Sequence, residues 1–265
     1  MSSTSSPSMT LNDAAERANV HYQTAYRWVR DGRLPASMVD GSYRVLVSDL
    51  EALLDAKAAP APKRPPSLER VQRLEPRMLD ALLTGDEPTA RKIGRQLADE
   101  GLGMVDLIEG VLVPPLIEIG RRWHEGQLSI SVEHRASAIV ERLLGDVSPN
   151  PRGRRRGTVV VAAVSGDRHS LPTAMAAVVL RERNWIVHQL GADLPVEALL
   201  EFCRDHEEID VVVLSSTAPD RIEATKEAAV EIEQLGVSTL VGQPGATLGD
   251  LIDQVDRAAG RTSAA

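Results

Sequence analysis

Apolar and polar residues follow two different rhythms along this chain, and the change falls near residue 157. From residue 68 to about 145, apolar positions recur every three or four residues, with breaks near 85–86, 100–103 and 126–131. This period predicts amphipathic helices, and connections this short fit antiparallel neighbours. We therefore predict a four-helix bundle over residues 68–148.

Beyond residue 157, short apolar runs rich in β-branched residues alternate with helical stretches. Such alternation predicts βαβ units and a parallel sheet covered on both faces. We expect a flavodoxin-like α/β domain over residues 158–260. Its predicted strands are 158–164, 185–189, 211–214 and 237–241, and its predicted helices are 173–183, 196–206, 221–235 and 248–259.

The first part of the chain has the pattern of a winged helix-turn-helix over residues 10–57. Thr10 and Asp13 have the spacing of a capping box, and helices are expected over 11–18 and 22–31. Asp40-Gly41 predicts a hairpin turn, and Ser48 is expected to cap a helix that runs to about residue 57. Residues 1–9 are expected to form a flexible tail.

Two proline- or arginine-rich segments separate these regions, so we predict a multi-domain protein. Residues 58–67 have the composition of a stiff linker. Residues 149–157 form a second linker, whose arginines suit a solvated hinge or, as an alternative, a phosphate contact. A chain of 265 residues is also longer than one ordinary domain requires.

Charge and cysteine usage narrow the possible functions. The 30 basic and 38 acidic side chains give a net charge of −8, which excludes a uniformly basic nucleic-acid binder but not a local basic face. Cys203 is the only cysteine, so no disulfide framework is possible and we expect it to serve packing. Because no apolar run reaches about 18 residues, we expect no membrane span and a cytoplasmic protein.

The second predicted helix and the hairpin carry the candidates for DNA contact. The alternative is a helical hairpin that binds no nucleic acid. Several arginines are expected on one side of this domain, which favours DNA binding. Tyr22, Trp28 and Val29 are expected to form the small core. The DNA-binding candidates are Gln23, Thr24 and Arg27 toward base edges, and Arg30 and Arg44 toward phosphates.

Residues 24–35, 41–44 and 48–51 carry a resemblance to the excisionase/MerR type of DNA-binding domain. The segment Thr24-Ala25-Tyr26-Arg27-Trp28-Val29-Arg30-Asp31-Gly32-Arg33-Leu34-Pro35 is its most specific part. The resemblance implies double-stranded operator DNA as a partner.

A second set of candidates lies where two bundle helices meet at one loop. Trp123 and His124 end a helix that Gly126 should terminate, and Ser131 should cap the next one, with Glu133 and His134 in its first turn. An aromatic plate beside hydrogen-bonding groups suits a large planar or nucleoside-bearing ligand. As an alternative, the helix dipole alone favours Glu133 in a first turn.

Three loops of the α/β domain should meet at one edge of the sheet, because ligands bind at the carboxyl ends of parallel strands. They hold Gly166–His169, Ser215-Ser216 and Gly242–Gly245. His169 could be the axial ligand of a metal, with Asp167 orienting its other ring nitrogen. The alternative is a solvated loop histidine.

The whole arrangement resembles the CarH/LitR family of cobalamin-dependent, light-responsive transcription regulators. The resemblance lies in residues 122–126 and 131–137, the Asp-x-His motif at Asp167 and His169, and Leu190–Pro195. It implies an α/β domain of the cobalamin-binding type and a regulator, not an enzyme. It also implies homo-oligomers that bind operator DNA and repress in the dark, and that dissociate in light.

The same resemblance implies the cofactor site. Adenosylcobalamin would lie between bundle and α/β domain, with His169 as the lower axial ligand of cobalt. Ser215, Ser216 and Gly242 would lie at the cofactor's nucleotide tail. Around the upper adenosyl group would lie Trp123, Glu133 and His134, with His124 able to take the upper position once light breaks the cobalt–carbon bond.

The chain departs from the family pattern on the side of the nucleotide tail. Pro172, Thr217 and Gln243 stand where the family has Gly, Leu and Gly, and a helix–strand element is missing after Gly245. Pro172 could re-aim the His169 loop, and Gln243 could fill the slot for the tail. Two alternatives therefore stay open: haem or another tetrapyrrole on His169, or no cofactor and control by a partner protein. A third, a corrinoid carrier for methyl transfer, has no use for a winged helix.

Overall fold

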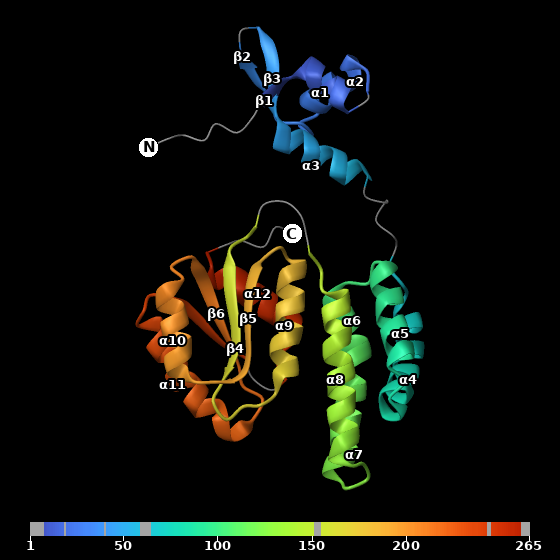
Figure 1. Ribbon diagram of the computed structural model, residues 1–265, viewed down its shortest axis with the longest axis vertical. Helices are drawn as coiled ribbons and strands as arrows, with labels where there is room; N and C mark the ends of the chain where they lie inside the picture. Colours follow the sequence, from blue (N-terminus) through green and yellow to red (C-terminus); the bar gives the residue numbers. More distant parts are fainter. Residues whose placement is uncertain are drawn as a thin grey trace. The chain divides into compact units, whose positions relative to one another are not determined.

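The computed structural model describes residues 8–18, 20–39, 41–58, 65–150, 155–242 and 245–260. The chain divides into two compact units, residues 1–63 and 64–265 (Figure 1). No helix among the described residues is both long and apolar enough to cross a bilayer.

The first unit is a three-stranded antiparallel sheet with three helices. Its strand order is β1-β3-β2, and its core holds Leu11, Ala25, Trp28, Leu34 and Leu50. The winged helix-turn-helix layout is as predicted. Its elements are β1 (Ser8–Thr10), α1 (Leu11–Arg17), α2 (Tyr22–Arg30), β2 (Ser37–Val39), β3 (Ser42–Leu46) and α3 (Val47–Ala58).

Local details of this unit confirm some predictions and correct others. The capping box forms, with Asp13 N donating to Thr10 Oγ1 over 3.2 Å. Ser8, predicted in the tail, pairs with Leu46 in the sheet. α3 starts at Val47, so Ser48 lies within the helix. Tyr22, expected in the core, is 44% exposed, because the small interior is already filled by Trp28 and aliphatic side chains.

The second unit begins with the predicted four-helix bundle. The third helical run is continuous from Met104 to His124 but contains a π-helical segment before Pro114 and Pro115, where Val113 N donates to Ile108 O. The two prolines have no N–H to donate, so the regular pattern of helical hydrogen bonds is interrupted there. Segments of π-helix are frequent at functional sites. The bundle consists of α4 (Leu68–Thr84), α5 (Glu87–Asp99), the run α6 (Met104–Leu107), η1 (Ile108–Leu112) and α7 (Val113–His124), and α8 (Ile130–Val147).

The rest of the second unit is a parallel sheet of the predicted kind, with strand order β5-β4-β6-β7 among the described residues. This is the flavodoxin-like order without its fifth strand, as the missing element after Gly245 predicts. Residues 243 and 244 lie outside the described residues, and so does the predicted effect of Gln243. The elements are β4 (Thr158–Val164), α9 (Ser170–Glu182), β5 (Ile186–Leu194), α10 (Val196–Asp205), β6 (Ile209–Ser215), η2 (Pro219–Arg221), α11 (Ile222–Glu233), β7 (Ser238–Gly242) and α12 (Leu248–Ala258).

Every residue of β4 is buried, because helices cover both faces of the sheet. Val159 and Val161 pack in one core with α9, α12 and the bundle. Val160 and Ala162 pack in the other core with α10 and α11, which also holds Cys203 in the packing role that we expect. Strand alternation thus divides one apolar run between two cores.

Among the described residues, the bundle and the α/β domain share one core and are joined by polar contacts at two helix starts. Met104 N, at the start of α6, donates to the carboxylate of Glu182 over 3.0 Å. Leu248 N, at the start of α12, donates to Glu109 Oε1 over 2.6 Å. Each carboxylate thereby satisfies a free N–H at a helix start. These two contacts therefore tie the bundle to α9 and α12 of the α/β domain.

Candidate functional site

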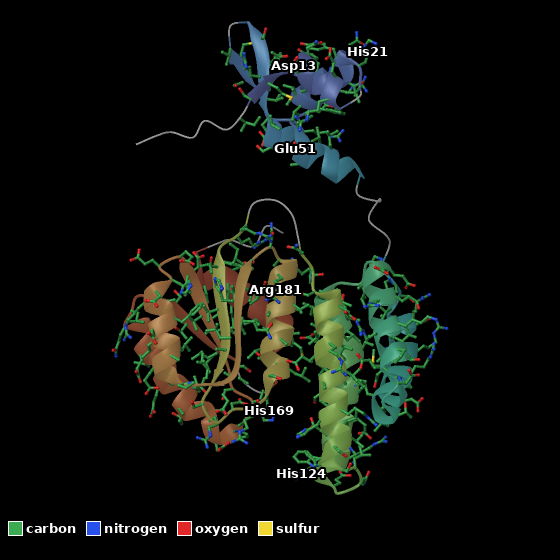
Figure 2. All side chains as sticks on the ribbon, in the orientation of Figure 1. Asp13, His21, Glu51, His124, His169 and Arg181 are labelled. Atoms are coloured by element: carbon green, nitrogen blue, oxygen red, sulfur yellow. The ribbon has the colours of Figure 1, made fainter. Side chains whose placement is uncertain are left out.

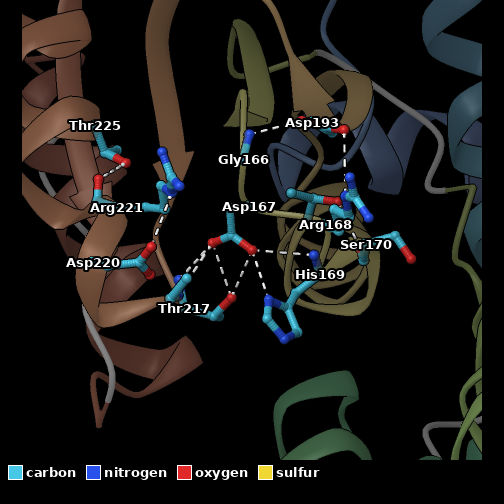
Figure 3. Close-up of polar contacts among 12 residues, drawn as sticks. Gly166, Asp167, Arg168, His169, Ser170, Asp193, Thr217, Asp220, Arg221 and Thr225 are labelled. Atoms are coloured by element: carbon cyan, nitrogen blue, oxygen red, sulfur yellow. Dashed lines mark hydrogen bonds and ion pairs between the residues drawn. The ribbon is translucent and has the colours of Figure 1, made fainter. Parts of the chain in front are cut away.

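The loop after β4 carries Asp167 and His169, and the structure joins them as the sequence predicts. His169 Nδ1 lies 2.7 Å from Asp167 Oδ1, and His169 N donates to the same oxygen over 3.1 Å (Figure 3). The carboxylate is fully buried whereas the imidazole is 62% exposed. Because an ionised carboxylate only accepts, Nδ1 carries the proton, and the lone pair of Nε2 is free for a ligand.

Thr217 completes this arrangement, although its sequence position alone did not predict a role at the site. Its N donates to Asp167 Oδ2 over 2.8 Å, and its Oγ1 lies 2.9 Å from the same atom. Burial alone would raise the pKa of Asp167, but the hydrogen bonds from Thr217 and His169 outweigh it and lower the pKa to about 2. Thr217 stands where the family pattern has Leu. This departure therefore gives Asp167 a second hydrogen-bond donor besides His169.

Asp193, from the end of β5, fixes the loop from the other side. Gly166 N donates to Asp193 Oδ1 over 2.7 Å, and Asp193 N donates to Asp167 O over 2.9 Å. Asp193 itself has φ +55°, a left-handed conformation that residues with a side chain rarely adopt. These contacts hold it there and give the Leu190–Pro195 motif a structural role.

Pro172 leaves the contact between Asp167 and His169 intact. It is the third residue of α9, where the missing N–H has no intrahelical partner to lose. The Asp167–His169 pair forms despite it. The expected disturbance from this substitution is therefore not found.

A cavity of about 490 Å³ lies beside the carboxyl ends of β6 and β7 and reaches to the bundle. The three residues that we predict at the nucleotide tail of the cofactor all line this cavity. Ser216 is 2% exposed, and its Oγ has no hydrogen-bond partner among the described residues. A buried hydroxyl without a partner is costly unless something pairs with it. The predicted lining residues are Ser215, Ser216 and Gly242.

The four bundle candidates lie at the connection from α7 to α8. Trp123 is 44% exposed at the end of α7, followed by His124. In α8, His134 Nδ1 lies 2.7 Å from Glu133 Oε2, and Ser137 Oγ donates to Glu133 Oε1 over 2.8 Å. The helix begins at Ile130 after Ser129, so Ser131 is not the cap that the sequence suggests. Figure 2 shows His124 and His169 at the same end of this unit.

In the first unit, the DNA candidates share the outer surface of α2 and β3. Gln23, Arg27, Arg30 and Arg44 are exposed, and Thr24 is partly buried. Arg30 Nε lies 3.3 Å from Asp31 Oδ1, with both side chains exposed, and such a surface pair is weak. It leaves the guanidinium available.

Three tyrosines on α2 and β3 form a cluster of aromatic rings that we did not predict from the sequence. The rings of Tyr22 and Tyr26 stack at 6.4 Å, and those of Tyr26 and Tyr43 meet edge to face at 5.8 Å. The spacing of four residues between the first two is a sequence signal for this contact.

Family models match nearly the whole of the described chain. A helix-turn-helix domain matches residues 8–58, and two models described as B12 binding domain match residues 74–145 and 157–250. The chain therefore combines a helix-turn-helix domain with two domains of the B12-binding type. The resemblance seen in the sequence is thereby confirmed for all three domains.

Individual relatives agree with these domain matches. The HTH-type transcriptional repressor CarA of Myxococcus xanthus is 32% identical over 190 residues, which are 68% of this chain and 60% of that protein. Trimethylamine corrinoid protein 1 of Methanosarcina acetivorans is 25% identical over 144 residues, 52% of this chain and 65% of that protein. This chain thus spans less than two thirds of either relative's length.

Among solved structures, the monomethylamine corrinoid protein of Methanosarcina barkeri has a TM-score of 0.53 and 13% sequence identity. The match covers 73% of this chain and 97% of that chain. At this identity it establishes the shared fold alone.

The described residues fit a cobalamin. His169 offers Nε2, the atom that an axial ligand needs, and Asp167 fixes the required tautomer. The adjoining cavity is largely apolar and holds the unpaired hydroxyl of Ser216, a partner for a polar group of a ligand.

Proposed function

We propose that this protein is a DNA-binding transcription repressor controlled by adenosylcobalamin and light through ligand-dependent oligomerisation. The observation that carries the proposal is the Asp167–His169 pair in a chain that also has a helix-turn-helix domain. The name of the CarA relative supports repression.

In this mechanism, the chain's own residues position the cofactor and protect it. His169 would ligate cobalt through Nε2, while Asp167, held by Thr217, keeps the proton on Nδ1. Ser215, Ser216 and Gly242 would line the slot for the nucleotide tail. Bound adenosylcobalamin supplies a cobalt–carbon bond that light breaks.

On the bundle side, Trp123 would cover the adenosyl group and exclude water. Glu133, held by Ser137, would accept hydrogen bonds from that group, with His134 beside it. His124, at the end of α7, would offer a second imidazole able to hold the cobalt.

At the DNA, α2 would enter the major groove of an operator. Gln23, Thr24 and Arg27 would then reach base edges, and Arg30 and Arg44 would contact phosphates. A homo-oligomer binds several half-sites at once, so its dissociation weakens operator binding far more than one contact would.

The test is an absorption spectrum of the purified protein after mixing with adenosylcobalamin in the dark and desalting. We expect a retained corrin spectrum that changes under green light, together with a later elution in size-exclusion chromatography. A colourless desalted protein would exclude cobalamin control. A light-stable spectrum with unchanged elution would exclude the light switch.

A second candidate keeps operator binding and replaces cobalamin by haem or by control through a partner protein. Glu109 favours control through a partner protein, because its carboxylate also lines the cavity and would repel an anionic group such as the phosphate of the nucleotide tail. Mixing the apoprotein with haem distinguishes the candidates: a Soret band retained after desalting, without any retained corrin, would support it.

A further inference from the structure

All three tyrosines of the chain lie together where α2 and β3 meet. We call Tyr22, Tyr26 and Tyr43 the tyrosine cluster. The ring of Tyr26 is its middle member, because Tyr22 stacks on it with ring centroids 6.4 Å apart and Tyr43 meets it edge to face at 5.8 Å. Even so, Tyr26 is 41% exposed. The cluster therefore holds one aromatic ring in place at the surface of the first unit.

The core of the first unit does not account for these exposed rings. Trp28 fills the core from another side of α2, and neither Tyr22 nor Tyr26 belongs to that core. In the hairpin, Met38 pairs with Tyr43 and adds a side chain that is 59% exposed. Neighbouring exposed apolar side chains indicate a contact surface for another molecule.

The DNA candidates of α2 surround Tyr26. Gln23 lies three residues before it and Arg30 four residues after it, so the three side chains share one side of the helix. Arg27 follows Tyr26 directly. The tyrosine cluster is thus continuous with the surface that would enter the major groove, and the arginines beside it suit a polyanion. DNA is therefore the partner that this surface fits.

We propose that Tyr26 reads thymine in the operator, by placing its ring against the C5 methyl group in the major groove. The inference rests on the proposed DNA binding. Gln23 suits adenine and Arg27 suits guanine, whereas an exposed apolar side chain suits the thymine methyl group. Thr24 also carries a methyl group, but it is partly buried and lies on a different side of α2.

Tyr22 and Tyr43 are positioning residues in this proposal. Each contacts the ring of Tyr26, one from the preceding turn of α2 and the other from β3. These contacts restrict the orientations of the ring before DNA binds, and a side chain that is already ordered loses less entropy on binding. Removing either neighbour should therefore lower the preference for thymine, though less than removing Tyr26 does.

The test compares two duplexes that differ only in the methyl group. The full chain first selects a site from random duplexes, and a copy of that site is made with deoxyuridine in place of thymidine. Fluorescence anisotropy measures the affinity for both. We expect the unchanged protein and Tyr26→Phe to bind the deoxyuridine duplex about fourfold more weakly for each methyl group contacted. Tyr26→Ala should bind both duplexes equally.

Further variants separate the tyrosine cluster from the rest of the hairpin. Leu46→Ala is the matched control, because Leu46 is an exposed apolar residue of β3 outside the cluster, and it should keep the full preference for thymidine. Tyr22→Ala should keep part of that preference, and Tyr22→Phe should restore it. The midpoint of thermal unfolding of each variant shows that the first unit is still folded.

Three results would overturn the inference while leaving DNA binding intact. One is a selected site without thymine, and another is equal affinity of the unchanged protein for the two duplexes. The third is a Tyr26→Ala protein that loses affinity equally on both duplexes, which would make Tyr26 a contact to sugar or phosphate. Failure of the full chain to select any duplex would remove the proposed DNA binding together with the inference.

Discussion

Asp167 is the residue on which the geometry of the candidate site depends. It is fully buried and receives hydrogen bonds from His169, Thr217 and, at 3.4 Å, from Ala218 N. A buried carboxylate without such donors would be costly. Here the donors stabilise the ionised form and keep the imidazole of His169 in one tautomer.

His169→Ala should abolish the axial ligation of cobalt by protein. We expect cobalamin affinity to fall by about 10-fold or more, since even residues that only orient a metal ligand have effects of that size. Absorption spectra of the protein with hydroxocobalamin measure the change. His21→Ala, at an exposed histidine of the first unit, is the control, and identical spectra of all three proteins would refute the assignment.

Asp167 also makes a prediction about pH. Its pKa of about 2 lies below the ordinary 3.8, so its ionisation stabilises the folded state above about pH 4. That contribution, on the order of 2 kcal/mol, is lost as the pH falls from about 4 to 2. The difference in unfolding free energy between the unchanged protein and Asp167→Asn should therefore shrink over this range.

Denaturant unfolding followed by circular dichroism from pH 7 to 3 measures this difference. Asp220→Asn is the control, because the Asp220 side chain is 71% exposed and its ion pair with Arg221 should contribute little. A difference that stays constant below pH 4 would show that Asp167 is not stabilised as an anion.

At the scale of single elements, α2 carries the specificity of the proposed DNA binding. It presents Gln23 and Arg27 on its exposed side, while Ala25 and Trp28 are buried. Helical periodicity thus separates the side that reads DNA from the side that packs.

Arg27→Ala should weaken binding to the operator by about 1–3 kcal/mol and relax the sequence preference at one base pair. Fluorescence anisotropy with operator and random duplexes measures both effects. Arg17→Ala is a matched control, because Arg17 lies in α1 and pairs with Glu51 over 2.6 Å. An equal loss on both duplexes would make Arg27 a phosphate contact.

At the scale of the whole molecule, the cofactor candidates and the DNA candidates lie in different units. The second unit holds the bundle, the sheet and the core that they share. The proposed cobalt ligation and the proposed DNA reading are therefore assigned to separate compact units.

A fragment of residues 65–265 should bind adenosylcobalamin as tightly as the full chain does, within about twofold, because all candidate cofactor residues lie in it. Equilibrium dialysis of both proteins tests this. Binding that requires the helix-turn-helix unit would contradict the assignment of the site to the second unit alone.

The sequence by itself determined the elements and their order. The strand runs alternate with helices whose apolar faces recur at 3.6 residues, and β4 was predicted with its observed bounds. Such patterns are local, because each element must bury its own apolar face. The Asp167–His169 pair was also within reach, since the two residues are neighbours in one loop.

Only the tertiary structure decided which distant residues complete the site. Thr217 reaches Asp167 across 50 positions because the parallel order brings the ends of β4 and β6 together. Glu109 meets the start of α12 across 139 positions. Tyr22 is exposed for the same reason: the space in a core is shared among all the elements, and no local pattern records how it is filled.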